Sequence, residues 1–281
     1  MCRLLTKFCT ALILLLNSTE GWSADFQKGV DAYHKGDYAT ALREWKALAK
    51  QGDAQAQFQL GWMYSKGEGV SEDDQEAVKW YRLAAEQRHA HAQYNLGLMY
   101  DSGWGVPKDD KEAVKWFRRA AEMGFAEAQH NLGVMYQKGR GVRANVGEAV
   151  KWYRRAAEQG AAAAQSNLGW MYANGKGVPE DDTEAVKWYA LAAAQGLAKA
   201  QHNLGLMYDN GEGVPKDDKE AVTWYRRAAE QGDVFAQNNL GFMYEYGEGV
   251  LQNYVAAHMW FNIASFMGHK KSKQNYEFIE K

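Results

Sequence analysis

Residues 95–110 read "NLGLMYDSGWGVPKDD", and residues 203–218 repeat this string with only two differences, at Ser102 and Trp104. The Leu-Gly-x-Met-Tyr part of the string occurs six times, always 36 residues apart. Its copies begin at Leu60, Leu96, Leu132, Leu168, Leu204 and Leu240. A fixed period of this length, without insertions, predicts a solenoid built from helical hairpins.

Each 36-residue copy contains two patterns that predict helices. In the first helix, exemplified by residues 92–100, small and large apolar residues recur at i, i+4, i+7 and i+8, which places them on one face. These residues are Ala92, Leu96, Met99 and Tyr100. The predicted packed face of the second helix, taken from residues 148–157, is Ala149, Trp152, Tyr153, Ala156 and Ala157.

A glycine also lies inside every first helix, as Gly97 does between Leu96 and Met99. Glycine in a helix interior costs roughly 1 kcal/mol relative to alanine. Its presence in all six copies predicts that a neighbouring helix brings its backbone close at this point.

The ends of the second helix carry equally regular signals. Asp109 with Glu112 resembles a capping box, in which the aspartate accepts a backbone N–H and the glutamate reaches back to the N-cap. The helix is predicted to stop at a left-handed glycine, such as Gly124 or Gly160. Arg88 takes the place of this glycine in one copy and is predicted to be strained there.

The pattern divides the chain into four parts. We predict a signal peptide at residues 1–24, a shortened N-terminal capping hairpin at 25–52, six repeats at 53–268 and a C-terminal capping helix at 269–281. The last helix is predicted to pack through Tyr276, Phe278 and Ile279.

The first segment has the composition of a secretory signal. Arg3 and Lys7 give it a basic start, and an apolar run follows that is too short for a stable membrane anchor. We expect cleavage after Ala24, with a cut after Ser23 and an uncleaved anchor as alternatives. The cleaved chain is then periplasmic, in a Gram-negative type of envelope, or secreted, and it is not transmembrane.

Charge and cysteine content argue against several classes of protein. The formal net charge is -2, so no basic field favours nucleic acid. Both cysteines, Cys2 and Cys9, lie in the predicted signal peptide. The mature chain is therefore expected to have neither a disulfide nor a cysteine nucleophile.

Three motifs together resemble the Sel1-like repeat family, a 36-residue relative of the tetratricopeptide repeats. They are Ala-Gln-x-x-Leu-Gly-x-Met-Tyr, Gly-x-Gly-Val-Pro-x-Asp and Glu-Ala-Val-Lys-Trp-Tyr-Arg-x-Ala-Ala, and they cover about residues 25–269. The resemblance implies an all-α, right-handed superhelical solenoid of antiparallel helix hairpins that acts as a scaffold or adaptor. One bacterial branch has a disulfide in every repeat and is linked to penicillin binding. This chain lacks those cysteines, so that activity is not carried over.

The repeat accounts for the motifs that could otherwise indicate chemistry. The Gly-x-Gly of residues 103–105 follows a helix instead of a strand and recurs six times, so we interpret it as a turn and not as a phosphate loop.

The histidines are not arranged as metal ligands. His89 and His91 are two residues apart and cannot share a helix face. His130 and His202 lie two repeats apart, too far for a shared ion. Paired aspartates at helix starts are explained by capping. We therefore predict no catalytic residue, metal or cofactor.

Positions that differ between the copies are the candidates for binding, since positions that meet the same neighbour in every repeat are needed for packing. On the first helices the variable positions fall at i, i+3 and i+7, which is one helical stripe. We call this set the first-helix stripe: Phe58, Trp62, Tyr94, Leu98, His130, Trp170, His202, Phe235 and Phe242. In the related architecture this face is concave, so the stripe is a hypothetical peptide-binding surface. The alternative is that each side chain packs beneath the next repeat.

Two further features concern the loops and the second helices. The position between the loop glycines is charged in five copies, but in one it is Trp104, which we predict to be a contact to a neighbouring loop or an exposed anchor at the rim. The basic residues of the second helices, for example Arg118 paired with Glu122 at i+4, are interpreted as a solvated convex face.

The sequence thus favours a non-enzymatic, exported scaffold that binds a protein or peptide partner on the concave face. Two other classes remain open at this stage. One is a cell-envelope hydrolase that interacts with penicillin, and the other is a carbohydrate-binding module, because exposed aromatic rings also stack on sugars.

Overall fold

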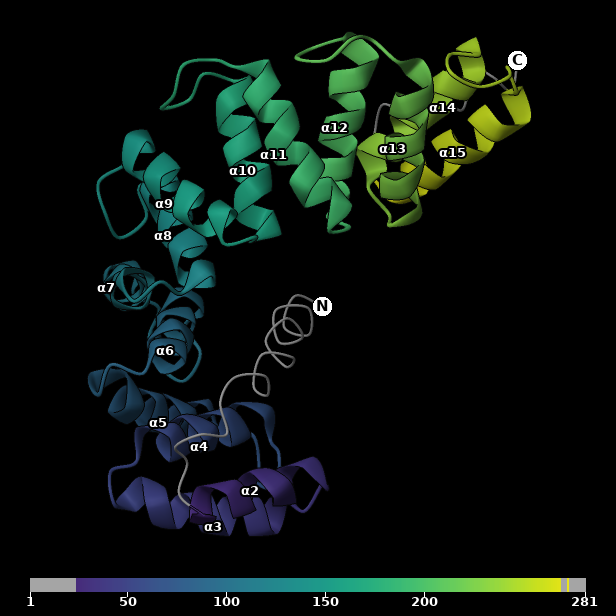
Figure 1. The fold of residues 1–281 in the computed structure, drawn as a ribbon. Helices are drawn as coiled ribbons and strands as arrows, with labels where there is room; N and C mark the ends of the chain where they lie inside the picture. Colours follow the sequence, from purple (N-terminus) through teal and green to yellow (C-terminus); the bar gives the residue numbers. More distant parts are fainter. Residues whose placement is uncertain (1–23, 269–271, 273–281) are drawn as a thin grey trace. The chain divides into compact units, whose positions relative to one another are not determined.

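The computed structural model describes residues 24–268 and residue 272, and in these residues the chain is an all-α repeat solenoid without strands (Figure 1). Each 36-residue copy forms one pair of consecutive, contacting helices. Residues 1–23 of the predicted signal peptide and the predicted packing residues Tyr276, Phe278 and Ile279 lie outside the described residues.

The chain divides into two compact units. Unit 1 comprises the residues up to Ala92 together with the loop Trp104–Val106, and unit 2 comprises Gln93–Gly103 and the chain from Pro107 onward. Unit 1 contains α2 (Ala24–His34), α3 (Tyr38–Lys50), α4 (Ala54–Lys66), α5 (Asp74–Glu86) and the start of α6 (Ala90–Ser102).

Unit 2 contains the rest of α6 and the later helix pairs, which follow one another in chain order (Figure 1). These helices are α7 (Asp110–Glu122), α8 (Ala126–Lys138), α9 (Val146–Glu158), α10 (Ala162–Ala173), α11 (Asp182–Ala194), α12 (Ala198–Asn210), α13 (Asp218–Glu230), α14 (Val234–Tyr246) and α15 (Tyr254–Phe266).

The predicted packing faces are confirmed. Ala92, Leu96 and Met99 are buried on the first helix, and all five predicted residues of the second helix, from Ala149 to Ala157, are buried as well. Trp152 packs into an apolar cluster that includes Val114 of α7, in the preceding repeat, and Leu132 of α8, in its own repeat. The tryptophan of the second helix therefore joins one repeat to the one before it.

The glycine inside each first helix faces an aromatic ring of the second helix. A Cβ atom on Gly133 of α8 would lie 2.7 Å from the ring of Tyr153 and 3.3 Å from the carbonyl oxygen of Ala149. The predicted close approach is confirmed, but the group nearest to the glycine is the tyrosine ring and not the backbone.

A buried glutamine links three successive helices. The Gln129 side chain donates from Nε2 to the Ala121 carbonyl (3.1 Å) and accepts at Oε1 from Gln159 Nε2 (2.7 Å). This arrangement satisfies both ends of a buried amide and connects α7, α8 and α9. In the sixth repeat Met267 replaces the second glutamine, and the buried Oε1 of Gln237 has no partner.

The predicted capping box is only half right. Asp109 accepts the N–H groups of Lys111 (2.9 Å) and Glu112 (3.2 Å), as predicted. Its own backbone N–H, however, donates to the Tyr100 carbonyl of the preceding helix (3.0 Å). Because that donor is already satisfied, Glu112 does not reach back and instead pairs with Lys115 (3.0 Å).

The second glycine of each loop packs against the preceding hairpin. Gly141 has φ of 64°, and a Cβ atom there would overlap the carbonyl oxygen of Asp110, the first residue of α7. Gly69 lies in the same way against Tyr38, the first residue of α3. The Gly-x-Gly segment is thus a turn, as predicted, and also a contact between successive hairpins.

Arg88 is the only residue other than glycine with a positive φ in the described part of the chain, at 65°. We expect Arg88→Gly to stabilise the protein by about 1 kcal/mol, because glycine adopts this conformation without strain. Thermal unfolding tests this, and Arg88→Ala is the matched control, since it keeps the Cβ atom and should change little. A lower melting temperature for Arg88→Gly would contradict the prediction.

Candidate functional site

The two members of the first-helix stripe in unit 1, Phe58 and Trp62 on α4, are 3% and 6% exposed. The Phe58 ring stacks on His89 with centroids 4.7 Å apart. Trp62 Nε1 donates to the hydroxyl oxygen of Tyr33 at 3.2 Å. Both side chains are therefore engaged within unit 1 in this structure.

Two stripe residues of α6 are half-buried in unit 2. The Tyr94 ring lies 5.9 Å from Phe117 and 5.1 Å from Phe125, measured between centroids. Both Tyr94 and Leu98 pack against the apolar cluster built around α7 and α8.

The two histidines of the stripe bond to the next repeat. His130 Nε2 lies 3.0 Å from Asn167 Nδ2, and His202 Nε2 lies 3.3 Å from Asn239 Nδ2. Each ring nitrogen therefore accepts from an amide. Burial lowers the pKa of both imidazoles, so they are neutral near pH 7.

The most exposed stripe residues are in the second half of the chain. Trp170 on α10 is 38% exposed and Phe235 on α14 is 56% exposed, whereas Phe242 is half-buried against Phe261, with ring centroids 5.0 Å apart. Tyr246, which is 63% exposed, stacks on Phe242 with an interplanar angle of 9°.

Tyr246 is a residue that the sequence analysis missed. It continues the stripe by one turn, because it lies four residues after Phe242 on the same helix face. The equivalent position holds Asn174 and Asn210 in the two preceding repeats. A comparison of copies at this position would have found it.

Trp104, the predicted rim residue, is half-buried within unit 1. The residues at its position in two other loops contact the preceding hairpin. Glu68 accepts from the Tyr33 hydroxyl at 2.6 Å, and Arg140 binds Asp110 through Nη2 at 2.7 Å. At this position of the loop a side chain thus commonly contacts the preceding hairpin. The role of Trp104 in binding stays a prediction.

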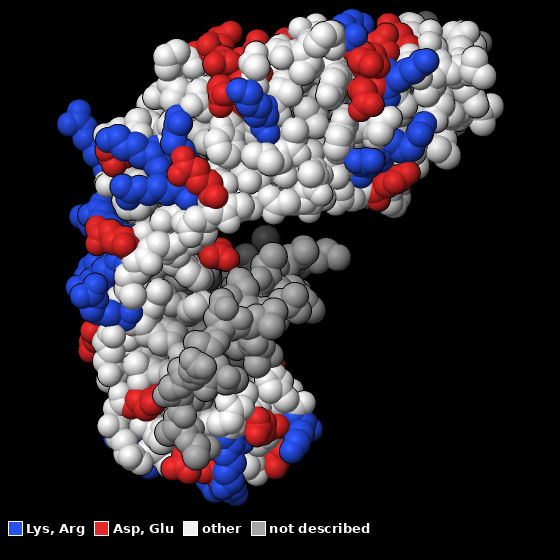
Figure 2. All heavy atoms as spheres, in the orientation of Figure 1, with Lys and Arg blue, Asp and Glu red and all other residues white. Residues whose placement is uncertain are grey.

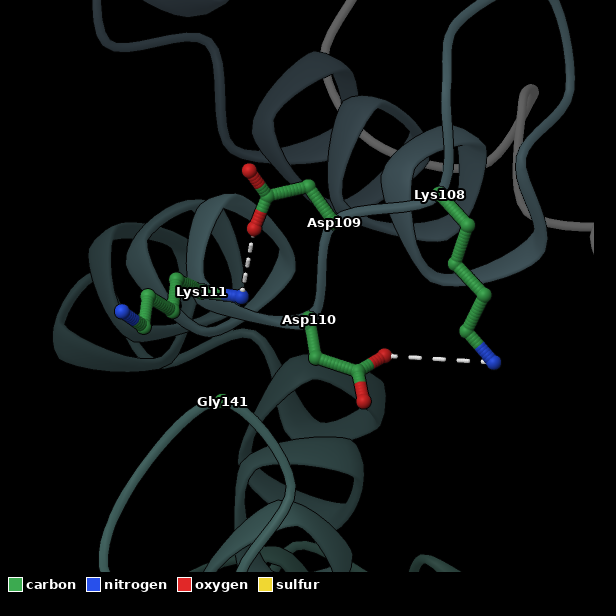
Figure 3. Close-up of a pocket in the computed structure, with 5 residues that line it drawn as sticks. All are labelled: Lys108, Asp109, Asp110, Lys111 and Gly141. Carbon is green, nitrogen blue, oxygen red and sulfur yellow. Dashed lines mark hydrogen bonds and ion pairs between the residues drawn. The ribbon is translucent and has the colours of Figure 1, made fainter.

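A shallow hollow lies where the loop that carries Gly141 meets the start of α7 (Figure 3). It is lined by Lys108, Asp109, Asp110, Lys111 and Gly141. Its two carboxylates point in different directions and both are engaged. Asp109 caps α7, and Asp110 binds Arg140, which also contacts Asp101. The hydrogen bond from Arg140 lowers the pKa of Asp110 below its usual range. The hollow is thus a junction between repeats, and its two carboxylates are bound to other groups of the chain.

The basic residues of the second helices lie on the outer surface, where Figure 2 shows them gathered over α7 and α9. The predicted i, i+4 pairing of Arg118 with Glu122 is wrong. Arg118 donates to the Tyr136 hydroxyl at 2.8 Å, while Arg119 lies 4.7 Å over the ring of Trp116. These arginines thus stabilise the tyrosine and tryptophan side chains that join the helices.

His89 caps the first turn of α6. Its Nδ1 accepts the backbone N–H of Ala92 at 3.2 Å, and its Nε2 lies 2.7 Å from Gln55 Oε1. A ring that accepts at one nitrogen and donates at the other is neutral. Burial, and then the nearby His91, lower the pKa of His89 from 6.5 to about 4.

We expect this cap to make unit 1 sensitive to acid. The folded-state pKa is below the unfolded value, so the unfolded chain binds the proton first as the pH falls. The contribution of neutral His89 to the free energy of unfolding is complete above about pH 6.5 and is lost as the pH falls toward 4. Between pH 7 and pH 5 this loss amounts to about 2 kcal/mol. Urea unfolding at several pH values measures it.

The matched variant for this prediction is His89→Asp, because Asp53 and Asp233 cap the equivalent turns of α4 and α14. This variant should weaken the pH dependence between pH 5 and pH 7, while the remaining histidines still contribute. Equal slopes for the variant and the wild type would contradict the assignment.

Among residues 24–268 and 272, no three His, Cys, Asp or Glu side chains come together as metal ligands. None of the described helices combines the length and the apolar composition that a membrane span requires.

The helix pairs, the glycine contacts and the inter-repeat bonds define an α-solenoid of the tetratricopeptide-like class. The family model of the Sel1 repeat matches residues 54–89, 90–125, 126–160, 162–197, 198–233 and 234–269. The chain therefore belongs to the Sel1 repeat family. This repeat is generally a non-catalytic scaffold fold, and Sel1 repeats typically bind proteins.

Two solved structures show how far the similarity extends. The chain is 41% identical to c5321 of uropathogenic Escherichia coli, described as a protective antigen with an SLR fold, with a TM-score of 0.80. That match covers 85% of this chain and 51% of the other, so the chain spans about half the length of c5321. A Sel1 repeat protein from Oxalobacter formigenes is 36% identical, with a TM-score of 0.78, and 86% and 97% of the two chains are covered. No curated protein matches the chain.

Proposed function

We propose that the protein is an exported, non-enzymatic scaffold that binds a peptide or protein segment through the first-helix stripe of unit 2, on the concave side of the repeat array. The observation that carries this proposal is the exposure of Trp170. Leu98 and Leu206 fill the same repeat position and are half-buried there, so packing does not require the larger ring. Exposed aromatic side chains of this kind are typical anchors of protein interfaces.

Polar groups beside the anchors support a peptide ligand. Asn131, Asn167 and Asn203 recur on the same helix face and are half-buried. Asn131 Oδ1 and Asn167 Nδ2 already bond to His130, so Asn131 offers its amide N–H and Asn167 its carbonyl oxygen to an extended peptide backbone. Export rests on the signal-like composition of residues 1–24.

The test is selection of peptides from a phage-displayed library by the mature protein, followed by affinity measurements on the selected peptides. We expect Trp170→Leu, which introduces the residue of two other repeats, to weaken binding at least tenfold. The variant Tyr246→Asn should act in the same direction. Leu191→Ala, at an exposed position on the second helix α11, is the control and should bind normally.

Other results would lead to a different function. Failure to select any peptide, or equal affinity for Trp170→Leu and the wild type, would overturn the proposal. Binding to a glycan array that is lost in Trp170→Leu would indicate a carbohydrate-binding module. Labelling of the purified protein by a fluorescent penicillin would contradict the proposal that the protein is not an enzyme. Trp62→Ala is a poorer test, because truncation of a buried tryptophan costs about 3–5 kcal/mol of stability.

A further inference from the structure

The last helix, α15, exposes an apolar face. We call Val255, Met259, Ile263 and Phe266 the α15 stripe. They lie at i, i+4, i+8 and i+11, which is one face of a helix. All four are exposed, Val255 to 80% and Phe266 to 90%. Leu251, Tyr254 and Met267 flank the stripe and are exposed as well.

The same positions are exposed and mostly charged in other repeats. On α13 they are Lys219, Thr223, Arg227 and Glu230, and on α7 they are Lys111, Lys115, Arg119 and Glu122. The α13 positions remain exposed although α12 and α14 pack on either side. The packing of one repeat on the next therefore does not cover this face. Ser272, which donates to Asn238 of α14 at 2.8 Å, lies at the α14 side.

We propose that the α15 stripe binds the same stripe of a second copy of this chain, in a dimer with two-fold symmetry. The four stripe side chains and their three neighbours present on the order of 800 Å² of accessible surface, which is the area that each partner contributes to a standard interface. The face exceeds the apolar patch of an ordinary monomer, roughly 300–600 Å².

Charge favours a second copy as the partner. α15 contains no Lys, Arg, Asp or Glu, and the end of unit 2 that it forms is drawn white in Figure 2. Two identical apolar stripes can meet about a two-fold axis without bringing like charges together. An interfacial membrane helix instead carries basic residues along the helix itself; α15 has none, and Lys270, Lys271 and Lys273 follow it in the sequence.

The position of the stripe also favours a closed dimer. Only in the sixth repeat are all four of these positions apolar, whereas each of the other five repeats has at least one lysine there. Self-pairing is thus confined to one patch per chain, and a two-fold contact of this kind closes instead of growing into a filament. The surface is separate from the first-helix stripe, so the two proposals stand independently.

The experiment is sedimentation equilibrium of the mature chain over a wide range of concentrations. We expect a dimer for the wild type. The double variant Val255→Glu, Phe266→Glu introduces like charges at both ends of the stripe, so that no end-to-end ion pair can form across the two-fold axis, and it should weaken dimerisation roughly 100-fold. Leu191→Arg, which places a charge at the position in α11 that corresponds to Ile263, is the matched control and should remain a dimer. Circular dichroism should show unchanged folding of both variants, since all three positions are exposed.

Each other outcome overturns the proposal. A wild type that stays monomeric at all concentrations has no self-association. A dimer that persists in the double variant uses another surface. A monomer that co-sediments with vesicles of phosphatidylglycerol and phosphatidylethanolamine, and loses this property in the double variant, has a lipid partner instead. Trp170→Leu should leave the dimer intact, which separates this test from that of the peptide site.

Discussion

Gly141→Ala is expected to destabilise the protein by about 3 kcal/mol or more. The new Cβ atom would overlap the backbone carbonyl oxygen of Asp110, and a carbonyl at the start of a helix cannot rotate away. Overpacking of this kind costs about 1–3 kcal/mol, and alanine at a positive φ adds about 1 kcal/mol. The free energy of unfolding in urea measures the sum.

Gly160→Ala is the control for this prediction, because Gly160 belongs to the same repeat and also has a positive φ, of 90°. An added Cβ atom there meets no atom within 4 Å. This variant should be destabilised only by the strain of alanine at a positive φ, which costs about 1 kcal/mol. Equal losses for the two variants would mean that contact of the loop with α7 contributes nothing to stability.

Gly133→Ala tests the second close contact, and here two effects have opposite signs. Helix propensity alone favours alanine by about 1 kcal/mol. The Cβ atom would lie 2.7 Å from the Tyr153 ring, however, and that ring is fully buried and cannot move aside. We expect the contact to dominate, with a net loss of about 2–3 kcal/mol.

Gly147→Ala separates these two effects. Gly147 lies in α9, within the same repeat, and the nearest atom to an added Cβ is Asn145 Oδ1 at 3.4 Å. This variant should gain up to about 1 kcal/mol, because only the propensity term applies. Gains for both variants in thermal unfolding would show that the ring can move away from Gly133.

Local sequence signals predicted the parts of the fold that depend on one repeat. The periodic faces of both helices and the stop glycines needed only spacing and backbone conformation, as did the strain at Arg88. Contacts between one helix and another were harder to predict. The backbone N–H of Asp109 bonds to Tyr100, and Arg118 bonds to Tyr136; neither partner can be inferred from helix-internal spacing.

The candidate site shows the same difference between features set within one repeat and contacts with residues elsewhere in the chain. Comparison of the copies identified Trp170 as a position where packing does not require an aromatic ring, and in the structure this residue is 38% exposed. The burial of Trp62 depends in part on Tyr33, a residue of the N-terminal hairpin that has no counterpart in the repeats. The α15 stripe was missed because only the first helices were compared position by position for apolar differences.

The loop glycines give the array a direction. Each loop reaches back to the start of the second helix in the preceding hairpin, as Gly69 does to Tyr38 and Gly249 does to Asp218. Removing whole repeats from the carboxyl end therefore leaves every remaining loop with its contact. Removing the amino-terminal hairpin deprives the first remaining loop of the residue against which it packs. Shortening the chain by whole repeats at the carboxyl end thus keeps every loop contact that remains, whereas shortening it at the amino-terminal end removes the partner of one loop.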